Sequence, residues 1–303
     1  MRSVSGQSFR RWVVRWAALL ACGLMPLTPV WAETFRNQFS GAAWHPETSV
    51  FECRLVQPIA QFGAAIFTRR AGEEQRFVLH SNNRVLAAGE AGIRAENPEW
   101  REMVDPQALG VVSASGDDAL AMDWQGSQKL ASALREGRRL VFSHRAWAET
   151  DRPVNVMVEP VGFRDGFTTF TDCLSDLLPV NFDQVERTAL YFPAGFNDIP
   201  ETEVDKLNRI AEYAKADEKV VRLYVDGHTD GTGLRAENLE LSQERAELIT
   251  QYLTDRGIPQ DRIITRWHGE RYPVGSNRTE EGRTENRRVT VRLERSDDRL
   301  SAR

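Results

Sequence analysis

Residues 220–257, VVRLYVDGHTDGTGLRAENLELSQERAELITQYLTDRG, combine a strand pattern, a polar loop and a helix pattern. The mostly apolar run from Val220 to Val225 leads into Gly227, which is typical of a short buried strand bounded by a turn. From about Ala236 to Arg256 apolar residues recur at helical spacing, and Gly257 has the usual position just after a helix end. The stretch therefore predicts a strand, loop and helix unit of an α/β domain.

An arginine lies on the apolar face of this predicted helix. At about 100° per residue, one face collects Asn238, Leu241, Arg245, Leu248, Ile249 and Tyr252. A charge that points into a core needs a partner, and Asp230 in the preceding loop could simply pair with Arg245. The two groups could instead converge on a zwitterion, with the guanidinium holding a carboxylate and Asp230 holding an ammonium group. The pattern alone leaves both interpretations open.

Strands and helices alternate along the rest of the C-terminal region. The patterns predict one more helix, from Glu201 to Ala214. They also predict three more strands: Thr188 to Phe192, Ile263 to Trp267 and Val289 to Leu293. A long polar loop precedes the last strand. Residues 286–288 are predicted to begin this strand, and their side chains would then add donors to the cleft that Asp230 and Arg245 face. We expect a two-layer α/β sandwich in a domain of residues 179–303.

Residues 33–178 show a different pattern, with short alternating runs broken by Gly, Asn, Pro and charged residues. Five runs are predicted strands: Val50 to Val56, Ala64 to Arg69, Arg76 to His80, Leu140 to Ser143 and Val154 to Val161. One helix is predicted from Ser127 to Arg135, with Gly137 as its stop. We expect an antiparallel β domain with one helix, a sandwich or barrel, and hence an α+β protein of two domains.

Residues 1–32 have the features of a secretory signal peptide. Four arginines precede an apolar run from Trp16, and Val30-Trp31-Ala32 provides a cleavage site. A membrane anchor is the first alternative, although the run is short and contains two prolines. Lipidation of Cys22 is the second. The signal peptide predicts export to the periplasm.

Two cysteines, Cys53 and Cys173, remain behind this predicted cut. An even number in an exported chain favours a disulfide, which would tie the two halves because Cys173 lies at their junction. Two buried free thiols are the alternative.

Composition limits the function. The chain has 303 residues, enough for two domains, and its net charge of -5 does not favour a protein that holds nucleic acid by its phosphates. Asp226, His228 and Asp230 alternate like metal ligands, but a fourth ligand is not evident, so we expect neither a metal nor a cofactor. No P-loop or nucleophile elbow occurs, which favours a protein that is not an enzyme.

Four separated motifs resemble one family of domains. GHTDGTGLRAENLELSQERA, LTDRGIPQDRI, GERYPVGSN and GRTENRRVTV occur in the order found in the peptidoglycan-associating domain of OmpA, Pal and MotB-type proteins. The resemblance implies that Asp230 and Arg245 bind the zwitterionic centre of diaminopimelate in the stem peptide. It implies further contacts from Thr229, Asn238, Asn286 and Arg287.

Two N-terminal segments resemble the MotY family of sodium-type flagellar motor proteins. They are residues 52–72, ECRLVQPIAQFGAAIFTRRAG, and residues 170–182, FTDCLSDLLPVNF. This resemblance implies a non-enzymatic ring component in the periplasm, at the outer membrane and cell wall, that recruits and anchors stator units. Its implied partners are peptidoglycan, the flagellar basal body, a MotX-like protein and the stator complex. A wall-binding envelope protein unrelated to motility, or an enzyme that uses Asp230 or His228 on peptidoglycan, are the alternatives.

Overall fold

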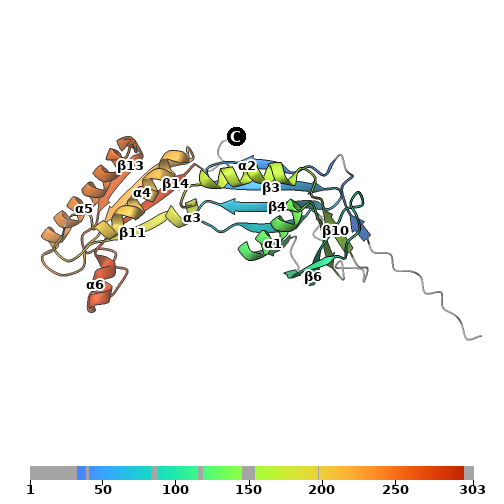
Figure 1. Ribbon diagram of the computed structural model, residues 1–303. Coiled ribbons are helices and arrows are strands. Elements are labelled where there is room, and N and C mark those ends of the chain that lie inside the picture. The colour runs from blue at the N-terminus through green and yellow to red at the C-terminus, as the bar shows by residue number, and fades with distance from the viewer. Residues whose placement is uncertain are drawn as a thin grey trace, which may run out of the picture.

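The computed structural model describes residues 33–38, 41–82, 88–114, 119–144, 154–196 and 198–296. The predicted signal peptide and Cys22 lie outside this part of the chain. No helix within it combines the length and the apolar character that crossing a membrane requires. Figure 1 shows two groups of elements placed end to end, which we call the N-terminal part (β1 to α2) and the C-terminal part (α3 to β14).

The N-terminal part is built on two five-stranded sheets. In one the strand order is β1 (Glu33–Phe35), β10 (Val154–Val158), β9 (Arg139–His144), β6 (Gly89–Glu96) and β7 (Gln107–Ala114). In the other it is β2 (His45–Thr48), β3 (Glu52–Ile59), β4 (Gly63–Arg70), β5 (Arg76–Ser81) and β8 (Ala119–Met122). All pairs are antiparallel except β1 with β10. The antiparallel class is therefore confirmed.

Two helices pack against these sheets. The predicted helix is α1 (Trp124–Arg135), whose N-cap Asp123 accepts a hydrogen bond from the Gly126 amide. The second, α2 (Phe163–Ser175), was not predicted, since its threonines and Gly166 weaken the helical pattern. A Cβ at Gly166 would lie 2.8 Å from Leu55 Cδ1, so this glycine lets α2 pack closely on β3.

The predicted disulfide is present. Cys53 in β3 and Cys173 in α2 are bonded, with their Cα atoms 6.0 Å apart. Both cysteines belong to the core of the N-terminal part. The expectation that the bridge ties the two halves is therefore wrong: it fixes α2 onto β3 within the N-terminal part.

The C-terminal part is a two-layer structure. Its sheet has the order β11 (Arg187–Tyr191), β14 (Arg288–Arg295), β12 (Val220–Gly227) and β13 (Ile263–Trp267). The helices are α3 (Phe182–Val185), α4 (Glu201–Ala216), α5 (Arg235–Asp255) and α6 (Glu280–Asn286), with a 3-10 turn at Gln260–Arg262. α4 and α5 pack on the sheet through a second apolar core. The predicted two-layer α/β class is confirmed.

Helix α5 forms where it was predicted. Compared with the predicted apolar face, its buried face is rotated about the helix axis toward residues with smaller side chains. Its buried side chains include Asn238, Ser242, Arg245, Ile249 and Leu253, while Leu241, Leu248 and Tyr252 are half-buried. The helix crosses close over the end of β12, where a Cβ at Gly227 would lie 2.1 Å from the Ser242 carbonyl oxygen. The glycine before the polar loop is therefore required by close packing of helix on strand.

The two parts share a packed junction. Phe51 and Ala71, from the N-terminal part, pack with the second core, and the Phe51 and Tyr213 rings are 5.7 Å apart. Arg70 forms an ion pair of 3.2 Å with Asp183. An apolar contact with a polar rim of this kind joins the two parts end to end in Figure 1.

Candidate functional site

Four loops meet at one edge of the C-terminal sheet. Strands β11, β12 and β13 are mutually parallel, since β11 and β12 both run antiparallel to β14 and β12 is parallel to β13. The segments after these three strands and the segment before β14 therefore lie at the same edge. Ligands of open α/β sheets bind at the carboxyl ends of such strands, and most of the predicted site residues lie here or at the start of α5.

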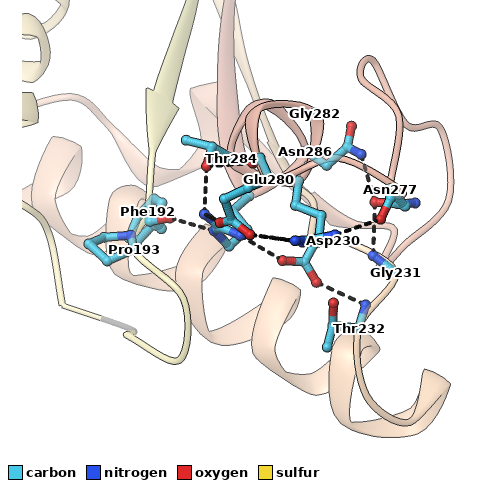
Figure 2. Close-up of polar contacts among 12 residues, drawn as sticks. Phe192, Pro193, Asp230, Gly231, Thr232, Asn277, Glu280, Gly282, Thr284 and Asn286 are labelled. Carbon is cyan, nitrogen blue, oxygen red and sulfur yellow. Dashed lines mark hydrogen bonds and ion pairs between the residues drawn. The ribbon is translucent and has the colours of Figure 1, made fainter.

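Asp230 pairs with Arg287 at this edge. Its Oδ2 lies 2.9 Å from Arg287 Nη1, and its Oδ1 accepts a hydrogen bond of 2.9 Å from the Thr232 amide (Figure 2). Burial would raise the pKa of Asp230, but hydrogen bonds from Arg287 and Thr232 outweigh it and hold the pKa below its ordinary value. Asp230 is thus a fixed carboxylate with a cation already beside it.

Arg287 is held from several sides. It is the C-cap of α6, and its Nη2 donates to Thr284 at 2.7 Å and to Glu280 at 3.1 Å (Figure 2). Its Nε donates to the Phe192 carbonyl. The sequence placed residues 286–288 at the start of the last strand, whereas Asn286 ends helix α6 and only Arg288 begins β14. The end of helix α6 therefore orients the Arg287 side chain toward Asp230.

Arg245 is fully buried and bonds to main-chain carbonyls. Its side chain is 0% exposed, and its Nε and Nη2 donate to the Phe196 carbonyl while Nη2 also donates to the Pro193 carbonyl. The guanidinium carbon lies 5.0 Å from the centre of the Phe192 ring. Within the described residues no carboxylate is within ion-pair distance of Arg245. The simple Asp230–Arg245 pair is therefore not formed.

Among the described residues, the buried donors without a partner include Arg245 Nη1 and Thr229 Oγ1 at this edge. Burial, and next the charge of Arg287, lower the pKa of Arg245 to about 10, so it stays a cation at neutral pH. A buried cation without a counter-ion is costly. This arrangement favours a ligand that brings a carboxylate.

Asn238 and Asn286 have hydrogen-bond partners within the chain. Asn238 Nδ2 donates to Glu270 at 3.1 Å. Asn286 is 0% exposed, accepts from the Val274 and Gly275 amides, and donates to the Gly275 carbonyl and Asn277. Asn277 in turn accepts from the Gly231 amide, as Figure 2 shows. We therefore assign Asn286 to shaping the loops, and its predicted contact with a ligand stays a prediction.

The alternating Asp226, His228 and Asp230 do not converge. Asp226 is bound by Arg266 at 2.6 Å and by His268 at 3.0 Å, while Asp230 faces Arg287. Across the ranges that the structure describes, no three His, Cys, Asp or Glu side chains are placed to hold a metal ion.

His228 is a buried neutral histidine, and we predict that it makes stability pH-dependent. Burial, then the charge of Arg288, lower the pKa of His228 from 6.5 to about 4. The folded pKa lies below the unfolded value, so the stabilisation is complete above about pH 6.5 and is lost as pH falls toward 4. The shift corresponds to about 3 kcal/mol.

The check is urea unfolding at pH 7.5 and pH 4.5 for the wild type and His228→Gln. The wild type should lose about 3 kcal/mol more than the variant over this interval. An equal loss in both proteins would show that His228 does not control this dependence.

The sequence reasoning missed the 193–196 loop and the Asp230–Arg287 pairing. Arg287 was named only as a ligand contact, and FPAGF after Tyr191 was not considered. The signal was available in part, since this loop follows a strand parallel to β12 and so must end at the edge that holds Asp230.

Comparison with known proteins defines the class first. Residues 191–287 match the OmpA family and residues 35–179 match the MotY N-terminal domain. The chain is therefore a protein with an OmpA-family domain behind a MotY N-terminal domain, and the resemblance seen in its sequence is confirmed.

Individual relatives give a more specific comparison than the two domain families. The sodium-type flagellar protein MotY of Vibrio parahaemolyticus is 28% identical over 247 residues, covering 81% of this chain and 84% of that protein. Peptidoglycan-binding protein ArfA of Mycobacterium tuberculosis is 42% identical over 85 residues, 28% of this chain and 26% of that protein. The C-terminal domain of Helicobacter pylori MotB has 26% identity and a TM-score of 0.35, covering 38% of this chain and 89% of that one. The prediction of a non-enzymatic protein agrees with the OmpA-family match and with the MotY relative, and is confirmed.

Proposed function

We propose that this chain is a non-enzymatic component of the flagellar motor that binds peptidoglycan through its C-terminal part and helps to recruit and anchor stator units. The family matches support this order of parts, with a MotY N-terminal domain before an OmpA-family domain. The name of the ArfA relative supports peptidoglycan as the ligand.

The observation that carries the proposal is the buried Arg245 with an unpartnered Nη1, at the same sheet edge as the fixed Asp230 carboxylate. A zwitterion such as the free centre of diaminopimelate has one charged group for each of these two side chains. Its carboxylate supplies an acceptor to Arg245, and its ammonium group shares Asp230 with Arg287. Before the ligand binds, Arg287 keeps Asp230 ionised and in place.

We extend the proposal to partners and location. The chain is exported to the periplasm by residues 1–32 and associates at the outer membrane and cell wall with the flagellar basal body. Its N-terminal part contacts the basal body and a MotX-like protein, while the C-terminal part holds the wall. A stator can exert torque only when it is held against the wall, and many weak contacts can provide that hold.

The wall-binding role is tested by pelleting the protein with purified sacculi. Asp230→Ala should weaken binding at least about tenfold, because the ligand ammonium loses its charge-assisted acceptor. Asp226→Ala is the matched control: it removes another paired carboxylate from the same region, but one bound to Arg266 on the sheet face. Equal binding by wild type and a normally folded Asp230→Ala would show that the receptor assignment is wrong.

The motor role needs a separate experiment. A deletion strain should grow normal filaments and swim poorly, and the protein should co-purify with basal bodies. Normal swimming together with intact sacculus binding would instead favour an envelope protein unrelated to motility.

A further inference from the structure

Helix α5 carries a stripe of acidic side chains on its outer face. Glu237, Glu240, Glu244, Glu247 and Asp255 are all exposed. At about 100° per residue these five positions fall within about 80° of arc, on the side away from the buried residues of the helix. We call them the acidic stripe. Among the described residues, no basic side chain is within ion-pair distance of Glu237, Glu240 or Glu247.

The opposite surface of the C-terminal part is basic. In β12 and β14 the core-facing residues are Leu223, Val225, Val289, Val291 and Leu293. Because side chains alternate along a strand, the residues between them face away from the helices. This outer sheet surface has five arginines and two acids: Arg187, Arg222, Arg266, Arg288, Arg292, Asp226 and Glu294. We call it the basic face.

The two acids of the basic face are already engaged. Asp226 is bound by Arg266 at 2.6 Å and 2.8 Å, and Glu294 accepts from the Tyr224 hydroxyl at 2.7 Å. In the described part of the chain, Arg187, Arg222 and Arg292 have no carboxylate within ion-pair distance. An excess of positive charge therefore remains on a surface where Arg187 and Arg222 are exposed.

Arg288 adds a second observation. It is 6% exposed, and its Nη2 donates to the Tyr272 carbonyl at 3.2 Å. Its Nη1 is buried and has no partner among the residues described. A buried guanidinium with an unused donor favours an incoming acceptor such as a carboxylate.

We propose that the acidic stripe of one copy docks on the basic face of the next, in a head-to-tail contact. The occupant is a second copy because the chain itself provides both complementary surfaces, on opposite sides of one domain. The sizes also agree: the stripe spans about 27 Å at 1.5 Å per residue, and the eight-residue strands β12 and β14 are about 26 Å long.

Contact between two different surfaces propagates from copy to copy, and it closes into a ring or extends as a filament according to the rotation at each step. This deepens the proposed motor role, since it supplies the contact between ring subunits. It does not depend on the side chains of Asp230 and Arg245, which belong to neither the acidic stripe nor the basic face.

The test is sedimentation of the full mature chain across concentration and salt. Wild type should associate in about 30 mM NaCl and dissociate in about 300 mM, with affinity at least about tenfold weaker at high salt. Two charge-reversal variants should each stay monomeric: Glu240→Lys/Glu247→Lys/Asp255→Lys on the stripe, and Arg187→Glu/Arg292→Glu on the sheet. Mixing the two variants should restore association, because each then offers the complement of the other.

A triple variant with the same charge change elsewhere, Glu90→Lys/Glu102→Lys/Asp105→Lys, is the matched control and should associate like wild type. Thermal unfolding shows which variants are folded, and sacculus binding separates this proposal from the wall-binding one. Wild type that stays monomeric at low salt overturns the proposal. So does a mixture of folded variants that fails to associate, or an Arg187→Glu/Arg292→Glu protein that loses sacculus binding and keeps self-association.

Discussion

Replacing Arg245 with Ala should lower the free energy of unfolding by about 3 kcal/mol and abolish detectable sacculus binding. The substitution empties a fully buried site and leaves the Pro193 and Phe196 carbonyls without their donor. Each unpaired buried group costs at least about 1 kcal/mol, and the cavity adds to this. Urea unfolding measures the first effect and pelleting with sacculi the second.

Arg245→Met separates the two effects. Methionine fills much of the arginine volume and removes a buried cation that has no counter-ion, so its cost in stability should be smaller than that of alanine. We expect this variant to fold and still bind sacculi at least about tenfold more weakly than wild type. Binding equal to wild type would mean that Arg245 only supports the 193–196 loop and does not meet the ligand.

Loss of the disulfide should be the largest single change in stability. The bridge closes a loop with a sequence separation of 120 residues, and the chain-entropy relation gives about 5 kcal/mol for a loop of this length. Cys53→Ser/Cys173→Ser should therefore unfold at a much lower urea concentration than the oxidised wild type. Wild type in reducing agent should behave like the double variant.

A non-reducing gel provides the control for this experiment. The oxidised chain is more compact when denatured and should migrate faster than the reduced chain. Equal mobility, or one unfolding midpoint with and without reductant, would contradict a stabilising bridge.

The secondary structure could be predicted from the sequence wherever a local residue pattern agreed with the packing in the fold. The runs at β3, β4, β5 and β12 were predicted because they join suitable composition with clear turns at their ends. Helix α2 was missed because Gly166 is set by close packing against Leu55 in β3. That contact is distant in sequence, so the local pattern does not reveal it. Helix α6 was taken as loop, since its seven polar residues show no apolar periodicity.

The site was predictable in its members but not in its pairings. Helical periodicity was sufficient to place Arg245 on the buried face. Its partners could not be found in this way, because Pro193 and Phe196 lie about 50 residues away and reach it only through the order of strands. The same holds for Arg287, which meets Asp230 because β14 runs antiparallel beside β12. Such pairings depend on the order and direction of the strands. The four family motifs indicated the fold of the domain as a whole, but not the individual pairings.

The junction between the two parts has a mechanical consequence. It involves Tyr213 near the end of α4, which meets Phe51 and lies close to the start of β12 and the end of β14. The edge that holds Asp230 lies at the other end of those same strands. A pull between these two ends acts along the strands, so the ladder of hydrogen bonds between β12 and β14 is loaded in shear, with many bonds sharing the force at once. A pull across the sheet would break them one after another.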